Sequence, residues 1–304
     1  MPCAIGIDIG GTHIKYGLVD HQGAILFESI RPTYRSHPLD TLLHAITETK
    51  EYATTTGLQP SGIGIGVPGI VDSGIVTACT ANLPELEGIA LADRMQQQPD
   101  LPIWVANDAH LMALAEWRYG AARHCTDAIF LTIGTGIGGA MLIDGQLYTG
   151  HQGRGGELGH IIVDINGKPC GCGGKGCLEA HASVKALMED YIKEHPEQKE
   201  VTGNDIIARY RENQPAAVTA LERHFKYLGA GIAGMINIFS PQKVIIGGGI
   251  SEAGNDYIDA IRRRALDRAM KETSSLTSIT VAALGNKAGF LGAAALVFDN
   301  VSHA

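Results

Sequence analysis

The pattern of apolar and polar positions at the start of the chain predicts three consecutive strands. Residues 3–30 read as "CAIGIDI", "GGT", "HIKYGLVD", "HQG" and "AILFESI", so that apolar runs alternate with glycine-containing turns. Residues 38–57 then predict a helix, because apolar positions recur at helical spacing from Leu39 to Ile46 and Gly57 offers a stop. The strands "SGIGIGVPG" and "LPIWVAN" and the helix "DAHLMALAEWRYG" complete this half.

The order of elements then begins again. "DAIFLTI", "GTG", "IGGAMLI", "DG" and "QLYTG" predict a second meander of strands, and "LTIGTGIGGAMLID" echoes "IDIGGTHIKYGLVD". Helices are predicted over 216–239 and in "NDYIDAIRRRALDRAM" and "KAGFLGAAALVF", with strands in "KVIIGGGI" and "SITVAAL". This repetition indicates an α/β duplication with two similar lobes and a central cleft, where ligands usually bind. We expect residues 1–119 with the C-terminal helix 287–304 to form the N-terminal lobe, and residues 120–286 the C-terminal lobe.

Composition and charge exclude several classes of protein. A chain of 304 residues with 45% hydrophobic and 18% charged residues is long enough for about two globular domains. The net charge of −8, without a run of Lys or Arg, argues against nucleic acid as a partner. No apolar stretch is long enough to span a membrane, and the chain opens on a strand pattern without a signal peptide. We therefore expect a cytoplasmic protein.

Three of the six cysteines are clustered in "GHIIVDINGKPCGCGGKGCLEAH", residues 159–181, whereas the others are scattered and read as small hydrophobic residues. Such a cluster suits a disulfide knot, a metal site or part of an active site. In a reducing cytosol Cys170, Cys172 and Cys177 are more often metal ligands than disulfide partners. With His160 as the fourth donor they form a Cys₃His set, typical of structural zinc, although His160 by itself also suits an ordinary polar role.

Two glycine turns occupy matching places in the two halves. In "DIGGT", Gly10, Gly11 and Thr12 let backbone amides approach an anion, and Asp8 can hold Mg²⁺ or its waters. One such turn alone favours a plain glycine hairpin. The second turn, "IGTGIGG", makes a pair of phosphate clamps the better interpretation, although neither turn matches a Walker or dinucleotide-binding motif.

Further candidates lie at predicted strand ends. In "VANDAH", Asn107 and Asp108 stand where a strand passes into a helix, so a helix cap and a proton-accepting carboxylate are both possible there. In "GGELGH" and "CLEAH", Glu157 and Glu179 flank the cysteine loop, and a metal would hold them in place. "GGGI" follows a buried strand and suits close passage under a ring or a ribose.

These motifs together resemble the ROK family of sugar kinases and related repressors. Residues 170–179, "CGCGGKGCLE", match the family signature C-x-C-G-x-x-G-C-x-E, which is highly specific. "DIGGT", "GVPG", "ANLP", "NDA", "GTGIGG", "GGELGH" and "GGGI" follow in the family's order, so the resemblance covers essentially the whole chain. Two departures stand out: His13 replaces the Lys that often follows "DIGGT", with Lys15 two residues on, and Ala140 replaces the last glycine of "GTGIGGG".

The resemblance implies the actin-like ATPase (ribonuclease H-like) fold, with ATP, Mg²⁺ and structural Zn²⁺, a small-molecule sugar as substrate, and a homodimer or homotetramer. It implies that Asp108 is the base that takes a proton from the sugar hydroxyl. The sugar would be surrounded by Gly69, Asn82, Asn107, Glu157, His160 and Glu179, with His160 also on zinc. The phosphates would lie near Gly10, Gly11, Thr12, Thr135 and Gly136, and the nucleoside near Gly248 and Gly249.

The favoured hypothesis is therefore an ATP-dependent hexose kinase that acts on the 6-hydroxyl of glucose. N-acetylmannosamine, N-acetylglucosamine, mannose, allose and fructose remain alternative substrates, because discrimination rests on a few pocket contacts. A non-catalytic sugar-sensing regulator is disfavoured by the intact glycine turns and by the seven residues before Asp8, too few for a DNA-binding domain. An actin-fold ATPase acting as a chaperone or scaffold explains neither the cysteine loop nor Glu179.

Overall fold

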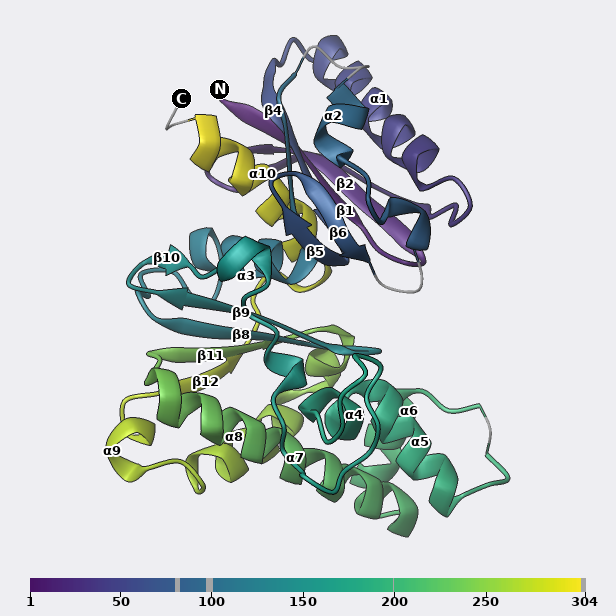
Figure 1. Ribbon diagram of the computed structural model, residues 1–304, viewed down its shortest axis with the longest axis vertical. Coiled ribbons are helices and arrows are strands. Elements are labelled where there is room, and N and C mark those ends of the chain that lie inside the picture. The colour runs from purple at the N-terminus through teal and green to yellow at the C-terminus, as the bar shows by residue number, and fades with distance from the viewer. Residues whose placement is uncertain (80–82, 97–100, 199, 302–304) are drawn as a thin grey trace. The chain divides into compact units, whose positions relative to one another are not determined.

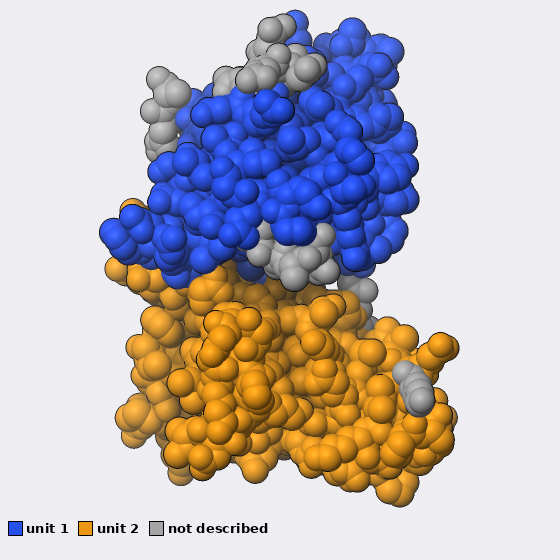
Figure 2. Space-filling view, turned by 45° about the vertical axis from the view of Figure 1, so that its right-hand side comes forward, with its two compact units in different colours: residues 1–124, 149–155, 286–304 blue, residues 125–148, 156–285 orange. Residues whose placement is uncertain are grey.

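The computed structural model describes residues 1–79, 83–96, 101–198 and 200–301. Contacts divide the chain into two compact units, shown in blue and orange in Figure 2. Unit 1 comprises Met1–His124, Thr149–Gly155 and Asn286–Ala304, and unit 2 comprises Cys125–Tyr148 and Gly156–Gly285. The segment Thr149–Gly155, expected in the later lobe, thus belongs to unit 1, where the Val71 carbonyl lies so close to Gly153 that a Cβ there would be 2.1 Å from it.

Unit 1 is built on a five-stranded sheet in the order β3-β2-β1-β4-β7 (Figure 1). Its first three strands form an antiparallel meander, and β4 and β7 are added parallel to β1. The strands are β1 (Cys3–Ile9), β2 (His13–Asp20), β3 (Ile25–Pro32), β4 (Pro60–Val67) and β7 (Ile103–Asn107), with a separate hairpin of β5 (Gly69–Asp72) and β6 (Ile75–Cys79). The helices are α1 (Pro38–Thr55), α2 (Leu91–Gln96), α3 (Asp108–Arg118) and α10 (Ala288–Val301).

The two faces of this sheet are covered differently, because isoleucine and glycine alternate in β1 and β4. The isoleucines of these strands are fully buried in a core that also contains Leu42 and Ala45 of α1. The glycines face α10, where a Cβ on Gly6 or Gly64 would lie 1.9 Å from the carbonyl oxygen of Phe290 or Ala293. Only glycine therefore lets the backbone of α10 lie directly on the strands.

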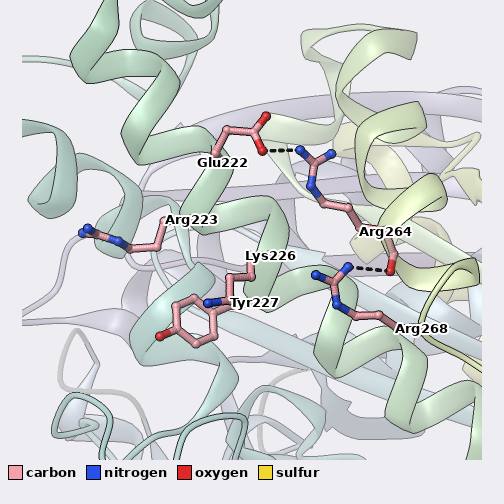
Figure 3. A pocket seen from close by; sticks show the side chains of 6 residues that line it. All are labelled: Glu222, Arg223, Lys226, Tyr227, Arg264 and Arg268. Atoms are coloured by element: carbon pink, nitrogen blue, oxygen red, sulfur yellow. Dashed lines mark hydrogen bonds and ion pairs between the residues drawn. The ribbon is translucent and has the colours of Figure 1, made fainter.

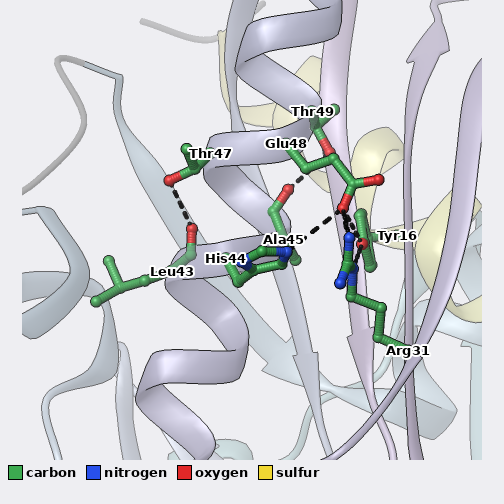
Figure 4. A network of polar contacts seen from close by, with 8 residues as sticks. All are labelled: Tyr16, Arg31, Leu43, His44, Ala45, Thr47, Glu48 and Thr49. Atoms are coloured by element: carbon green, nitrogen blue, oxygen red, sulfur yellow. Dashed lines mark hydrogen bonds and ion pairs between the residues drawn. The ribbon is translucent and has the colours of Figure 1, made fainter.

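A polar network fixes α1 to the edge of the sheet (Figure 4). The buried Tyr16 hydroxyl donates to the Glu48 carboxylate at 2.7 Å, and Arg31 donates to the same oxygen at 2.6 and 2.9 Å. Burial opposes ionisation of Glu48, but the hydrogen bonds from Tyr16 and Arg31 prevail and lower its pKa. The network joins β2, β3 and α1 at their polar margin.

Unit 2 repeats the strand order of unit 1. Its sheet runs β10-β9-β8-β11-β12, with an antiparallel meander followed by two parallel additions. The strands are β8 (Ala128–Ile133), β9 (Ile137–Ile143), β10 (Gln146–Leu147), β11 (Lys243–Gly247) and β12 (Ser278–Val281). The helices are α4 (Leu178–Ala182), α5 (Val184–Glu194), α6 (Gly203–Arg211), α7 (Pro215–Phe239), α8 (Asn255–Leu266) and α9 (Lys271–Ser274).

The long helix α7 organises the core of unit 2. Pro215 stands at its start, where a missing amide costs nothing, and Ser240 ends it in the left-handed conformation. Its apolar stripe, including Leu228 and Ile232, packs in one cluster with the buried side chains of β8 and β11. The helices α4, α5, α6 and α8 contribute to the same cluster.

The predicted α/β duplication is confirmed, since both sheets have the same order and the same change from antiparallel to parallel pairing. Some details differ from the sequence-based expectation, among them the helix α2 and the end of α8 at Leu266, four residues before the end of the predicted helix. The strand expected in "QLYTG" is limited to Gln146–Leu147, and the hairpin β5–β6 was not predicted at all. None of the helices within the described ranges is long and apolar enough to cross a membrane.

Candidate active site and metal loop

In unit 1 the candidate residues gather at one edge of the sheet. Strands β1, β4 and β7 are neighbours and parallel, so their carboxyl ends lie at the same edge. This edge carries Asp8, Gly69, Asn107 and Asp108. Asn82, the other residue expected near the sugar in this part of the chain, lies outside the described residues.

Asp8 lies in a tight, largely dehydrated place at the end of β1. A Cβ on Gly289, in the first turn of α10, would be 2.3 Å from its carboxylate. Burial raises the pKa of Asp8 to about 6, and the positive charge of Lys15, its cross-strand partner on β2, acts in the opposite direction. A cation such as Mg²⁺ would favour the ionised form, so this carboxylate suits a metal or its waters.

The glycine turn after Asp8 is held from several sides. Gly10 uses its amide inside the turn, where it donates to His13 O at 3.0 Å. Its carbonyl accepts from the Thr33 hydroxyl at 2.8 Å, and Arg35 donates to Gly11 O at 2.8 Å. Within the described part of the chain, no hydrogen bond is found for the amides of Gly11 and Thr12. These two amides, rather than that of Gly10, are available to an anion.

Asn107 and Asp108 take up the positions expected at the junction of β7 and α3. The Asn107 side chain caps the helix by accepting from His110 N at 3.0 Å, and its amide nitrogen donates to Gly69 O at 2.9 Å. Asp108 is half-buried, and its Oδ1 accepts from Ala109 N at 2.8 Å. Asp108 thus lies in the first turn of α3, where the helix dipole stabilises a carboxylate as the anion.

His110 is a neighbour that the sequence analysis did not single out. Burial lowers its pKa, against a smaller opposing effect of the Gly155 carbonyl, which lies 3.3 Å from the Nε2 atom of the ring. The ring is therefore neutral near pH 7 and anchors residue 155 to α3. The sequence could have indicated this burial, because His110 lies three residues after the cap residue Asn107, at a position that is buried in a helix of this kind.

In unit 2 the four predicted zinc donors come together. One donor atom from each of His160, Cys170, Cys172 and Cys177 can be chosen so that all lie within 4.8 Å of one another. The Cys170 Sγ to His160 Nδ1 distance is 3.6 Å, and the Cys172 Sγ to Cys177 Sγ distance is 3.7 Å. Tetrahedral zinc with Zn–S bonds of ~2.3 Å separates its sulfur ligands by ~3.8 Å, so the arrangement fits the metal.

The pKa values of the thiols show what a metal ion would have to supply. Burial and the neighbouring thiols raise the pKa of Cys177 to about 12, and burial raises that of Cys170. The Gly174 amide lowers the pKa of Cys172. Three thiols this close cannot all ionise without a positive charge among them, which is what a metal ion supplies.

The backbone of the loop depends on two glycines. Gly173 and Gly176 have φ values of 88° and 77°, and a Cβ on Gly176 would lie 1.8 Å from Asp164 O. Cys170 N donates to Gly174 O at 2.9 Å, and Gly176 N donates to Lys168 O at 2.8 Å. These bonds hold the cysteines in a compact double turn.

Residues 160–177, which contain the four donors and are here called the metal loop, lie beside two carboxylates. The Nε2 atom of His160, on the other side of the ring from the cysteines, lies 3.9 Å from Glu157 Oε2. A carboxylate beside the second ring nitrogen is the usual environment of a histidine ligand. Glu179 Oε1 lies 3.7 Å from Cys170 Sγ, while its Oε2 accepts from Ile137 N at 2.9 Å.

Glu179 thereby connects the metal loop to the second glycine turn. A Cβ on Gly136 would be 2.4 Å from Glu179 Oε2, so the carboxylate rests directly on this glycine. Gly134 N donates to Gly136 O at 2.9 Å and closes the turn, while Thr135 is exposed. As in unit 1, the described contacts include no hydrogen bond for the amides of Thr135 and Gly136, which leaves them to an anion.

Gly248 brings the end of β11 against the end of β8. Its φ is 91°, and a Cβ there would lie 2.2 Å from Ile133 O, so the position requires glycine. Gly249 has open space around its Cβ position. The two strands are parallel neighbours, so Gly248 and Gly249 lie at the same sheet edge as the turn that contains Thr135.

The sequence analysis missed contacts made by distant segments. Gly289 packs on Asp8, and Arg35 holds the first glycine turn. Lys168, inside the metal loop, binds Asp190 of α5 at 2.6 Å. The glycine in "KAGF" is a weak sequence signal for the contact with Asp8. The contacts of Arg35 and Lys168 have no signal in the sequence.

The fold and these sites define the class of protein. A double α/β unit with one glycine turn in each half is the actin-like ATPase, or ribonuclease H-like, fold. A ROK family glucokinase from Streptomyces griseus, crystallised with glucose and AMPPNP, is 32% identical, with a TM-score of 0.84 over 98% of this chain and 99% of that chain.

The family model of the ROK family matches residues 4–300, and the chain belongs to this family. It is 34% identical to a glucokinase of Thermotoga maritima, with 98% of each chain covered. It is also 31% identical to the xylose repressor of Bacillus subtilis, covering 98% of this chain and 77% of the repressor. The family thus contains both kinases and regulators.

Proposed function

We propose that this ATP-dependent sugar kinase transfers a phosphoryl group from ATP to the 6-hydroxyl of glucose, with Asp108 as general base. The observation that carries the proposal is the arrangement at the start of α3. There Asn107 caps the helix and binds Gly69 O, while the half-buried Asp108 carboxylate lies at the positive end of the helix. The glucokinases of Thermotoga maritima and Streptomyces griseus support glucose as the substrate.

Asp108 would accept the hydroxyl proton as the sugar oxygen attacks the terminal phosphorus. The hydrogen bond from Ala109 N to Asp108 Oδ1 fixes the orientation of the carboxylate, so a reacting hydroxyl would meet a pre-positioned acceptor. Asn107 and the Gly69 segment, joined by their hydrogen bond, would bind neighbouring hydroxyls of the same sugar. Positioning of this kind supplies much of the catalysis in phosphoryl transfer.

The free amides of the two glycine turns would bind the ATP phosphates. Gly11 and Thr12 offer them in unit 1, and Thr135 and Gly136 offer them in unit 2. Bound Mg²⁺ would neutralise phosphate charge, and Asp8 is the carboxylate placed to hold it or its waters. Gly248 and Gly249 would lie under the nucleoside, and at Gly248 only glycine permits the close approach of the backbone.

The metal loop would act as a support for sugar ligands. His160, Cys170, Cys172 and Cys177 would hold Zn²⁺, and the metal would fix Glu157 through His160, while Glu179, two residues after Cys177, is held by the Ile137 amide. Both carboxylates accept hydrogen bonds from hydroxyls, which suits a polyol. The zinc itself takes no part in the transfer.

The alternative function is a sugar-sensing regulator without catalysis. This alternative is supported by the similarity to the Bacillus subtilis xylose repressor, which extends over 98% of this chain. A regulator would bind sugar through the metal-loop side without releasing ADP. We further expect the active protein to be a cytoplasmic homodimer or homotetramer, which light scattering of the purified protein would establish.

The deciding experiment is an ADP-release assay with Mg-ATP and a panel of sugars. Glucose, mannose, allose, fructose, N-acetylglucosamine and N-acetylmannosamine cover the proposed and alternative substrates. We expect the highest kcat/KM with glucose and a product phosphorylated at the 6-hydroxyl. A higher value with another panel sugar would correct the substrate, and sugar binding without ADP release would establish the regulator.

A second experiment addresses the metal. Elemental analysis is expected to find about one zinc per chain, and Cys172→Ser to lose it, because a closed site needs all four ligands. Cys125→Ala, which changes a buried cysteine outside the loop, serves as the control and should keep the metal. Wild-type protein that binds the sugar and the nucleotide fully without zinc would contradict the supporting role.

A further inference from the structure

A hollow on the surface of unit 2 gathers positive charge in a protein with a net charge of −8. It has a volume of about 400 Å³ and is formed by α7 and by residues at and beyond the end of α8 (Figure 3). Its lining consists of four cations, one carboxylate and one tyrosine, namely Glu222, Arg223, Lys226, Tyr227, Arg264 and Arg268. None of these residues belongs to the catalytic or metal-binding sets proposed above.

The one carboxylate of the hollow is already neutralised. Glu222 forms an ion pair with Arg264, and its other oxygen accepts from the Tyr210 hydroxyl at 3.2 Å. Arg264 is further held by Ala260 O at 3.1 Å and lies over the Phe225 ring at 5.2 Å. The guanidinium is therefore rigid before any ligand arrives, which lowers the entropic cost of binding.

The remaining cations lack a full complement of negative charge. Among the described residues, neither Lys226 nor Arg268 forms an ion pair, and the Arg268 guanidinium donates only to Arg264 O at 3.0 Å. Arg264 and Arg268 are four residues apart, and Arg223 and Lys226 three, so each pair repels at helical spacing. Glu222 offsets Arg264 and Asp190 offsets Arg223, so an anion bound in the hollow would chiefly neutralise Lys226 and Arg268.

We propose that this hollow is a binding site for a small anion with several phosphoryl oxygens, such as a phosphate ester or a polyphosphate. Arginine presents two parallel N–H groups to phosphate oxygens, and three of the four cations are arginines. The exposed Lys226 adds a mobile point charge. The hollow shares no residue with the glycine turns expected to hold ATP, so the proposal goes beyond the kinase function.

The hollow is connected to the metal loop through two of its residues. Arg223 lies 3.5 Å from Asp190, whose other oxygen binds Lys168 of the loop at 2.6 Å. Tyr227 donates to Asp164 of the loop at 2.9 Å. Its ring also stacks on His181 of α4 at 4.2 Å, two residues after Glu179. An anion that orders Arg223 and Tyr227 would thus also order the loop that carries the zinc ligands.

Calorimetry with inorganic tripolyphosphate tests the site directly. The titration is done with saturating AMPPNP, Mg²⁺ and glucose, so that the proposed ATP and sugar sites are both occupied, and it is repeated with glucose 6-phosphate and with sulfate. We expect tripolyphosphate or glucose 6-phosphate to bind, and whichever binds more tightly identifies the polyphosphate or the ester as the ligand class. Arg268→Glu should weaken binding about tenfold or more, because a charge-assisted contact is replaced by repulsion.

Arg263→Glu is the matched control. Arg263 lies on α8 but does not line the hollow, so the same charge reversal should leave binding within a factor of about two, as expected for a screened surface charge. Absence of binding by both phosphate probes, or equal loss in both variants, overturns the site. Binding of a poly-aspartate peptide without binding of either phosphate probe would overturn it as well, in favour of an acidic protein partner. These readings need no catalytic activity and stay valid if the kinase function fails.

Hydrogen exchange tests the connection to the loop. Tripolyphosphate should slow exchange in a peptide covering residues 163–176 more than in one covering β10, which has no contact of this kind with the hollow. Tyr227→Phe keeps the ring but removes the bond to Asp164, and should reduce this difference while binding is retained. Equal slowing in both peptides would refute the connection to the loop.

Discussion

The two units share one strand order but hold their candidate functional residues by different means. Unit 1 places Asp8 and Asn107 at the ends of parallel strands and Asp108 at the start of α3, with α10 packed on the sheet through glycines. Unit 2 places Glu157 and Glu179 on either side of an irregular loop with four candidate metal donors, Glu179 on the short helix α4. The duplicated framework thus positions its candidate groups by packed regular elements in one unit and beside an irregular loop in the other.

The largest effect is expected at Asp108, the proposed base in unit 1. Asp108→Asn removes the proton acceptor but keeps the shape and the first turn of α3, so kcat should fall about 10²- to 10⁴-fold. The measurement is the ADP-release assay at saturating sugar, with circular dichroism to verify the fold. Asp93→Asn, an exposed change on α2, is the control and should leave kcat unchanged. Near-normal turnover of Asp108→Asn would move the base to another residue.

The packing of unit 1 is tested at Gly6. Gly6→Ala places a Cβ 1.9 Å from Phe290 O, and the displacement of α10 should cost about 3 kcal/mol. Both tryptophans, Trp104 and Trp117, lie in unit 1, so their fluorescence during urea unfolding reports on this unit.

Gly234→Ala, on α7 of unit 2, is the counterpart to Gly6→Ala. Its Cβ meets no atom within 4 Å, so alanine should stabilise unit 2 by about 0.5–1 kcal/mol. An unchanged tryptophan transition in Gly6→Ala would show that α10 does not depend on close contact with β1.

The core of unit 2 is expected to be sensitive to mild acid. Burial lowers the pKa of His224 to about 3, its Nε2 lies 2.7 Å from the Tyr257 hydroxyl, and its Nδ1 has no partner among the described residues. The unfolded histidine has a pKa near 6.5, so below that pH the unfolded chain binds a proton that the folded protein does not. The free energy of unfolding is therefore full above pH 6.5 and declines below it, by about 2 kcal/mol at pH 5.

His224→Gln keeps a hydrogen-bonding partner for Tyr257 but does not titrate. The difference in unfolding free energy between pH 7 and pH 5 should therefore be about 2 kcal/mol smaller in the variant than in the wild type. Hydrogen exchange of α7 peptides at the two pH values measures it. An equal pH dependence in both proteins would exclude His224 as the origin.

A smaller effect than at Asp108 is expected at the glycine turn of unit 2, against which the Glu179 carboxylate rests. Gly136→Ala pushes on the Glu179 carboxylate, and loss of one well-placed hydrogen bond should raise the KM for sugar about tenfold. Gly134→Ala, two residues earlier in the same turn, meets no atom within 4 Å and should leave this KM unchanged. A similar KM for both variants would indicate that Glu179 does not contact the sugar.

Local patterns allowed much of this molecule to be predicted. The helical periodicity before Phe239 predicts α7, and the Asn-Asp pair after "IWVA" predicts the cap of α3, because both depend on neighbours within one turn. The spacing of His160, Cys170, Cys172 and Cys177 predicts a four-donor cluster, since a short glycine-rich loop cannot separate them far. The roles of the site residues toward sugar and ATP stay predictions.

Other features could not be predicted because they join segments far apart in the chain. Glu179 rests on Gly136 across 43 positions of sequence, and Gly289 packs on Asp8 from the opposite end of the chain. The hairpin β5–β6 is local and was missed for another reason: its strands have only four and five residues, too few to show a clear alternation of apolar and polar positions.

The sequence by itself determined the α/β duplication, the family and the four metal donors, because alternation, helical periodicity and short-range spacing are local properties of a chain. The tertiary structure alone decided which glycines are indispensable, which carboxylate touches which turn, and that Arg223, Lys226, Arg264 and Arg268 line one hollow. Those relations depend on how β1 meets α10 and how α7 meets α8. Long-range packing, rather than residue type, sets them.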